Sequence, residues 1–96
     1  MIVWVLYDIE NDKNRNKVAK FCKQKGLYRV QLSAFLGTME RSDIDELSLM
    51  IEPLIDEAID KVYIFTMSQH DLKKCKMLGQ AFDKKLITDE VKSLFI

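Results

Sequence analysis

Several residue types that mark particular classes of protein are scarce in this 96-residue sequence. It has one histidine, His70, which alone cannot form a histidine-based metal site. Its two cysteines, Cys22 and Cys75, form no CxxC pair, so we expect reduced thiols rather than a structural disulfide. No hydrophobic run is long enough to span a bilayer, and the apolar start, residues 1–6, lacks the basic leader of a signal peptide. These absences predict a cytoplasmic protein with no membrane partner.

An excess of charge of one sign is also missing. The chain has 15 Lys and Arg against 15 Asp and Glu, so its net charge does not indicate a nucleic-acid partner. The charges are segregated, however: residues 1–37 carry seven basic and three acidic side chains, residues 38–60 one and eight, and residues 61–96 seven and four. Segregation can give one face affinity for phosphate, although charge alone favours the simpler interpretation of an ordinary solvated surface.

The composition and the apolar runs of the chain indicate one small globular domain, residues 1–96. Apolar residues make up 48% of the chain and charged residues 31%, and a chain of this length has a thin core. Two runs, 1–7 and 61–67, are almost continuously apolar and rich in β-branched and aromatic residues. Runs this short predict strands that are covered on both faces.

Residues 28–36 show a different pattern, in which apolar and polar side chains alternate. The alternation predicts one half-buried strand, with Arg29, Ser33 and Phe35 on its polar side. We expect Gly37 to mark a bulge or bend at its end.

Two helices are predicted between these strands. Asn11 or Asp12 caps the first, which runs to about Lys25, and Gly26 follows it in the left-handed conformation.

The second helix is predicted to begin at the cap residue Ser42 and to follow an apolar stripe to about Asp60. Pro53 interrupts this stripe, so we expect a kink there, or an early end followed by a last turn.

The pattern weakens toward the end of the chain. Residues 68–74 predict a polar turn and a short helical segment, residues 75–79 a short edge strand, and residues 93–96 extended chain. We expect residues 80–96 to form a C-terminal tail that pairs across a dimer or docks on a partner.

These elements predict an α/β (α+β) fold of the ferredoxin-like, β-α-β-β-α-β type, an antiparallel sheet with two helices on one face. Its two central strands are assigned to the runs 1–7 and 61–67. The other face of the sheet would expose Val, Tyr and Phe side chains. A second copy of the chain is the simplest cover, so we expect a homodimer.

Asp8 follows the first apolar run directly and precedes a lysine-rich helix. Catalytic groups often lie at such strand ends, but an Asx turn or a helix cap also explains an aspartate there, and position alone favours that structural role. One aspartate is a poor magnesium site. A two-fold axis would bring two copies of Asp8 together, and a divalent ion bridging them could activate water against a phosphodiester.

Four other residues are candidates for nucleic-acid binding. Ser33 and Arg29 offer a hydroxyl and a guanidinium group to phosphate, and Arg15 and Lys17 could clamp phosphates from the first helical turns. A solvated strand edge and a solvated basic helix face are the alternative interpretations.

Two aromatic residues, Tyr7 and Phe35, are assigned to support or dimer packing. Phe35 could stack on a base, but packing is the more usual role of such a residue.

The order and spacing of several motifs resemble those of a known family. The motifs are LYDI (6–9), DKNRNKVAKFCKQKGL (12–27), RVQLSAFLG (29–37), KVYIFTM (61–67) and KMLG (76–79). Together they resemble CRISPR-associated protein two, a subunit of the CRISPR spacer-acquisition machinery, over roughly the first eighty residues.

The resemblance implies a ferredoxin-like homodimer that cuts RNA or DNA with Mg²⁺ or Mn²⁺. The family's signature aspartate matches Asp8, its strand serine and phenylalanine match Ser33 and Phe35, and its basic helix-start position matches Arg15. Family members also bridge two dimers of the CRISPR integrase, CRISPR-associated protein one, and hold the duplex to be inserted. The chain departs from the family in having Arg15 flanked by asparagines, where a doubly basic helix start is usual.

Three hypotheses follow. The first is a metal-dependent endonuclease, an endoribonuclease or double-stranded DNase, that acts through paired Asp8 carboxylates in CRISPR adaptation. The second is a non-catalytic scaffold that binds duplex DNA and bridges the integrase dimers. The third is a stand-alone, toxin-like ribonuclease. The substitution Asp8→Ala discriminates the first from the second, and RNA and DNA both remain open as substrates.

Overall fold

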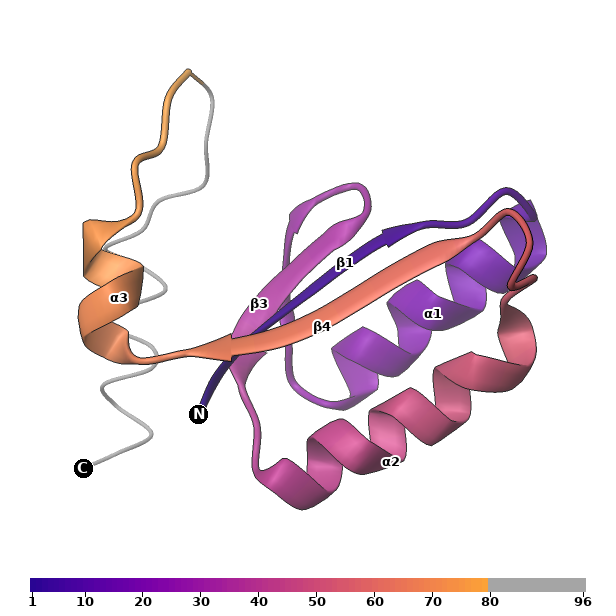
Figure 1. The fold of residues 1–96 in the computed structure, drawn as a ribbon, viewed down its shortest axis with the longest axis horizontal. Helices are drawn as coiled ribbons and strands as arrows, with labels where there is room; N and C mark the ends of the chain where they lie inside the picture. Colours follow the sequence, from indigo (N-terminus) through magenta and orange to yellow (C-terminus); the bar gives the residue numbers. More distant parts are fainter. Residues whose placement is uncertain (80–96) are drawn as a thin grey trace.

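The computed structural model describes residues 1–79, and Figure 1 shows how their elements are arranged. The strands form one antiparallel sheet in the order β2-β3-β1-β4, and α1 and α2 cover one of its faces. This arrangement confirms the predicted ferredoxin-like fold. The elements are β1 (Ile2–Asp8), α1 (Asp12–Gln24), β2 (Tyr28–Gln31), β3 (Ala34–Thr38), α2 (Arg41–Ile51), the 3₁₀ helix η1 (Glu52–Leu54), β4 (Lys61–Met67) and α3 (Gln69–Lys74).

The prediction of a single strand over residues 28–36 is wrong, because these residues form a hairpin. β2 and β3 pair antiparallel and are joined by a turn at Leu32 and Ser33. Of the residue types that usually signal a turn, this one contains only a serine, Ser33, which is a weak signal, so the alternation ran through it unbroken. The pairing register shifts between Arg29 and Gln31, which places the irregularity in β2 and not at Gly37.

Gly37 instead lies inside β3, opposite Val3 of β1. A Cβ atom at this position would come within 2.9 Å of Leu27 Cδ2 and 3.2 Å of Leu27 Cα. The glycine therefore allows Leu27 to pack closely against the strand.

The prediction that residues 61–67 form a central strand of the sheet is also wrong. In the described part of the chain β4 is an edge strand, and β3 lies in the middle of the sheet beside β1. Val62 and Ile64 pack against the core, whereas Tyr63 and Phe65 are 59% and 41% exposed. An apolar run cannot by itself distinguish a strand covered on both faces from an edge strand with an apolar outer face.

The first helix agrees with its prediction. The Asn11 side-chain oxygen accepts a hydrogen bond from the Asn14 N–H at 2.9 Å, which caps α1. Gly26 follows the helix with a φ of +84°, the left-handed conformation that favours glycine.

The N-cap of the second helix lies two residues before the predicted cap, Ser42. Glu40 is this N-cap, and the Asp43 carboxylate accepts a hydrogen bond from the Glu40 N–H at 3.4 Å, which fixes the start. The helix ends at Ile51 and Pro53 lies in η1, so the early end followed by a last turn is confirmed and the extension to residue 60 is not.

The last described segment is partly as predicted. Ser68 caps α3, a helix of six residues, but residues 75–79 form no strand. The predicted tail, residues 80–96, with its extended stretch 93–96, lies outside the described residues. Among residues 1–79 no helix combines the length and apolar character that crossing a membrane requires.

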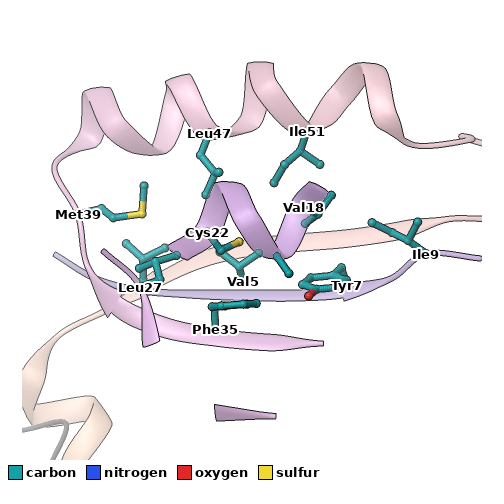
Figure 2. Close-up of a cluster of buried hydrophobic side chains, with 12 residues drawn as sticks. Val5, Tyr7, Ile9, Val18, Cys22, Leu27, Phe35, Met39, Leu47 and Ile51 are labelled. Atoms are coloured by element: carbon teal, nitrogen blue, oxygen red, sulfur yellow. The ribbon is translucent and has the colours of Figure 1, made fainter. Parts of the chain in front are cut away.

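The main core lies between the sheet and the two long helices, and Figure 2 shows its side chains there. Alternate residues of β1 point into it and meet Cys22 of α1 and Leu47 of α2, both completely buried. Burial raises the pKa of the Cys22 thiol to about 12, because the charged thiolate is poorly solvated there. Cys22 and Cys75 are both free thiols, as expected.

The opposite side of the sheet, which we call the open face, presents Trp4, Leu6, Tyr63 and Phe65. Trp4 is half-buried and its ring stacks on Phe65, with the ring centroids 6.2 Å apart. At one end of this face α3 packs Leu72 against the sheet. The aromatic residues of the open face therefore remain accessible in the described chain.

Candidate nucleic-acid and metal site

Four of the predicted site residues converge although they come from different elements. They line one surface depression of about 420 Å³. Lys17 does not line it, because it is exposed on the outer side of α1. We call this feature the Asp8 depression; its residues are Asp8, Ile9, Arg15, Asn16, Arg29, Leu32 and Ser33.

Asp8 is the last residue of β1 and is exposed. It lies opposite Lys61, the first residue of β4. Strand alternation places Asp8 on the same side of the sheet as Trp4 and Leu6, which belong to the open face. Its carboxylate is therefore accessible both from solvent and from any partner that covers this face.

Two hydrogen bonds hold Arg15 in the lining of the Asp8 depression. Its Nη1 donates to the Ile9 carbonyl at 3.2 Å, and its Nη2 donates to the Asp12 carboxylate at 2.5 Å. Both partners lie in or next to the loop between β1 and α1, so the guanidinium group is fixed across this loop. An exposed ion pair of this kind adds little stability, but it limits the positions that the guanidinium can occupy.

Arg29 is fixed by the hairpin turn. Its Nε and Nη2 donate to the Leu32 carbonyl at 3.1 and 2.6 Å, and its Cζ lies 5.5 Å from the centre of the Phe35 ring. The Tyr7 hydroxyl donates to the same carbonyl at 3.3 Å, and the Tyr7 N–H donates to the Ser33 carbonyl at 3.1 Å. These contacts attach the turn that carries Ser33 to the end of β1.

Tyr7 and Phe35 form the buried floor beneath this turn. Their rings stack with centroids 6.3 Å apart, and they are 5% and 0% exposed, so neither can stack on a base. Burial raises the pKa of the Tyr7 phenol, an effect that the nearby Arg29 opposes. The hydroxyl therefore remains a hydrogen-bond donor to the turn.

Asp60 also supports the site, although it was not among the residues predicted from the sequence. Its carboxylate accepts hydrogen bonds from the Glu10 N–H at 3.0 Å and the Asp56 N–H at 2.8 Å, which lower its pKa. It thereby connects the loop after Asp8 to the turn before β4. The sequence feature that could have indicated Asp60 is its position directly before the apolar run 61–67.

The donor atoms of the depression suit a hard cation. The Asp8 carboxylate, the Ser33 hydroxyl and the Asn16 amide carbonyl are oxygen donors of the kind that Mg²⁺ and Mn²⁺ prefer. Within residues 1–79 no group of three or more His, Cys, Asp or Glu side chains is placed to hold a metal ion. Asp8 is the only carboxylate among the residues that line the depression, and a second copy of the chain would supply another.

The chain is similar in sequence to known proteins. A family model described as "CRISPR associated protein Cas2" matches residues 1–75. A protein from Korarchaeum cryptofilum, named CRISPR-associated endoribonuclease Cas2, is 33% identical over 78 residues, which cover 81% of this chain and 84% of the relative. A protein of the same name from Desulforudis audaxviator is 38% identical over 74 residues, covering 77% and 70%.

Solved structures share the fold. Cas2 from Streptococcus pyogenes, in a crystal structure at pH 6.5, superposes with a TM-score of 0.71 and 26% identity, covering 82% of this chain and 100% of that one. A hypothetical protein from Thermus thermophilus gives a TM-score of 0.70 and 29% identity, covering 83% and 92%.

Proposed function

Because the chain belongs to the Cas2 family of CRISPR-associated proteins, we propose that it is an endonuclease that cuts phosphodiester bonds with Mg²⁺ or Mn²⁺ held by Asp8. The observation that carries the proposal is the convergence of Asp8, Arg15, Arg29 and Ser33 in one depression. Relatives are named endoribonucleases, so RNA is the first substrate to test and DNA the second. In this proposal the activity serves CRISPR adaptation, the acquisition of spacers.

The chemistry assigned to each residue follows from its geometry. Arg15 and Arg29 are fixed cations that can bind the non-bridging oxygens of a phosphodiester and stabilise the charge that develops on them. Ser33 can donate a hydrogen bond to the same group. A bound Mg²⁺ or Mn²⁺ supplies an acidified water and a polarised phosphoryl group.

A homodimer completes the proposed site. Tyr63 and Phe65 leave an apolar surface on the open face that favours burial against a second copy. Asp8 lies on the same side of the sheet, so a two-fold axis through this face brings the two Asp8 carboxylates toward each other. Two carboxylates repel each other unless a cation lies between them, which favours metal binding at the junction.

The decisive experiment is cleavage of labelled single-stranded RNA and duplex DNA with Mg²⁺, with Mn²⁺ and with chelator. We expect wild type to cut only with metal, and Asp8→Ala to cut about a hundredfold more slowly or not at all. Asp45→Ala, which removes an exposed carboxylate from α2, is the matched control and should cut like wild type. Equal cleavage by Asp8→Ala and wild type would refute the role of Asp8.

A second candidate function is a scaffold that holds duplex DNA and bridges the CRISPR integrase. It is supported by the two fixed guanidinium groups of Arg15 and Arg29, which suit phosphate binding without any cleavage. If neither wild type nor Asp8→Ala cuts, but both bind duplex DNA equally and co-purify with the integrase, this second function replaces the first.

A further inference from the structure

The outer face of α1 is uniformly basic. Besides its lysines, α1 exposes two neutral amides, Asn16 and Gln24. Its one carboxylate, Asp12, is bound to Arg15. We call the exposed lysines of this helix the lysine ridge; they are Lys13, Lys17, Lys20 and Lys23.

The ridge is not neutralised by the rest of the described chain. Within residues 1–79 the ion pairs join Asp12 to Arg15, and Lys25 to Asp43 and Glu46, so none involves a ridge lysine. The neighbouring helix α2 carries the acidic residues instead. The two helices that cover the sheet thus present charges of opposite sign to solvent.

This charge pattern works against the stability of α1. Lys13 and Lys17 are four residues apart, and Lys17, Lys20 and Lys23 follow at intervals of three, so each pair repels along the helix surface. Glutamate at alternate places would have stabilised the helix through attractive pairs. A helix that keeps repelling lysines on one face is typical of a surface that binds an extended anion.

The position of the ridge identifies that anion. It begins at the first turns of α1, where Arg15 and Asn16 line the Asp8 depression. From Lys13 to Lys23 there are ten steps of 1.5 Å along the helix, so the ridge is about 15 Å long. In duplex DNA the phosphates of one strand are spaced by about 3.4 Å along the helix axis, so the ridge spans about four phosphates of a strand with this spacing.

We propose that the lysine ridge is a second backbone contact for the same nucleic acid, so that a strand held in the Asp8 depression continues along α1 for about four more nucleotides. This inference rests on the proposed function. The exposed face of α1 carries no aromatic side chain, and lysine acts as a point charge on phosphate. The ridge therefore selects substrates by length and not by base sequence.

The test is binding without cleavage. Single strands of about four and about twelve nucleotides are titrated with chelator present at salt between about 50 and 200 mM. The ridge variant is Lys13→Gln with Lys20→Gln. The control variant is Lys74→Gln with Lys76→Gln, two exposed lysines elsewhere, so both variants lose the same charge.

For the longer strand, we expect the ridge variant to flatten the slope of log K against log salt by about 1.4, or 0.7 for each lost phosphate contact. The control variant should keep the wild-type slope, and binding of the short strand should be unchanged in both. Equal slopes in the ridge and control variants would overturn the proposal. So would equal losses for short and long strands.

Two further results separate this inference from the nuclease proposal. If wild type binds long strands through the ridge but cuts nothing, the ridge stands and the nuclease proposal fails. If the ridge variant changes the sedimentation of the protein alone and not its affinity for long strands, the ridge contacts protein and the inference fails.

Discussion

The two faces of the sheet differ in what covers them: α1 and α2 cover one face, and the open face lacks such a layer in the described chain. On β1, Val5 and Tyr7 point to the helices and are at most 5% exposed, whereas Trp4 and Leu6 on the open face are half-buried. Both sets are apolar. The comparison indicates that the helix side holds the larger buried core and that the open face keeps apolar side chains exposed, with Asp8 at its end.

The largest expected effect is on the helix side. Phe35→Ala should lower the free energy of unfolding by about 3–5 kcal/mol, because it removes a completely buried ring and leaves a cavity. Denaturant unfolding monitored by circular dichroism measures the loss. The matched control is Phe65→Ala, which truncates the same residue type on the open face, where it is 41% exposed.

Phe65→Ala should cost well under half as much, measured at a protein concentration low enough for monomer. Equal losses of unfolding free energy in the two variants would show that the two faces contribute alike to stability. That result would contradict the difference described above.

A smaller effect is expected on assembly. Replacing Tyr63 and Phe65 together by serine should weaken the proposed dimer by about 2 kcal/mol or more, roughly thirtyfold, because aromatic residues at the centre of an interface carry much of its energy. Sedimentation velocity over a dilution series measures the change. Leu49→Ser, on the exposed side of α2, is the control and should leave the dimer intact. A dimer that survives the double substitution unchanged does not use the open face.

The last effect, the smallest when it is taken per pH unit, concerns the two thiols. The pKa of Cys22 is raised from 9.0 to about 12, so between these values unfolding releases a proton from this thiol. The stabilisation is complete below about pH 9 and is lost as pH rises toward 12, by at most about 1.4 kcal/mol per pH unit. Unfolding of Cys22→Ala should lack this component of the alkaline decline. Cys75→Ala, on the other side of the sheet, should keep it, and parallel profiles for wild type and Cys22→Ala would contradict the assignment.

Much of the fold follows from local patterns in the sequence. Asn11 and Gly26 delimit α1 because capping and the left-handed conformation depend on single residue types. The hairpin was missed because its turn, at Leu32 and Ser33, contains only the weak turn signal of a serine. The edge position of β4 was missed because Tyr63 and Phe65 are as apolar as core residues, and only the pairing of strands shows that nothing in the described chain covers them.

The site was less accessible to prediction than the fold. Asp8, Arg15, Arg29 and Ser33 were chosen by residue type and position, and the structure brings them together. The group that fixes Arg29 and the turn carrying Ser33 could not be predicted in this way. It is the Leu32 carbonyl, a backbone atom that every residue possesses, which becomes a site feature only when the hairpin presents it to Tyr7 and Arg29.

The stacked pair on the open face has a practical consequence. Trp4 is the one tryptophan of the chain, and its indole N–H donates to the Met67 sulfur at 3.3 Å while its ring lies against Phe65. Its fluorescence therefore reports on this face alone. Covering the face should shift the emission to shorter wavelength as water leaves the indole, so the unlabelled protein carries its own optical sensor of assembly.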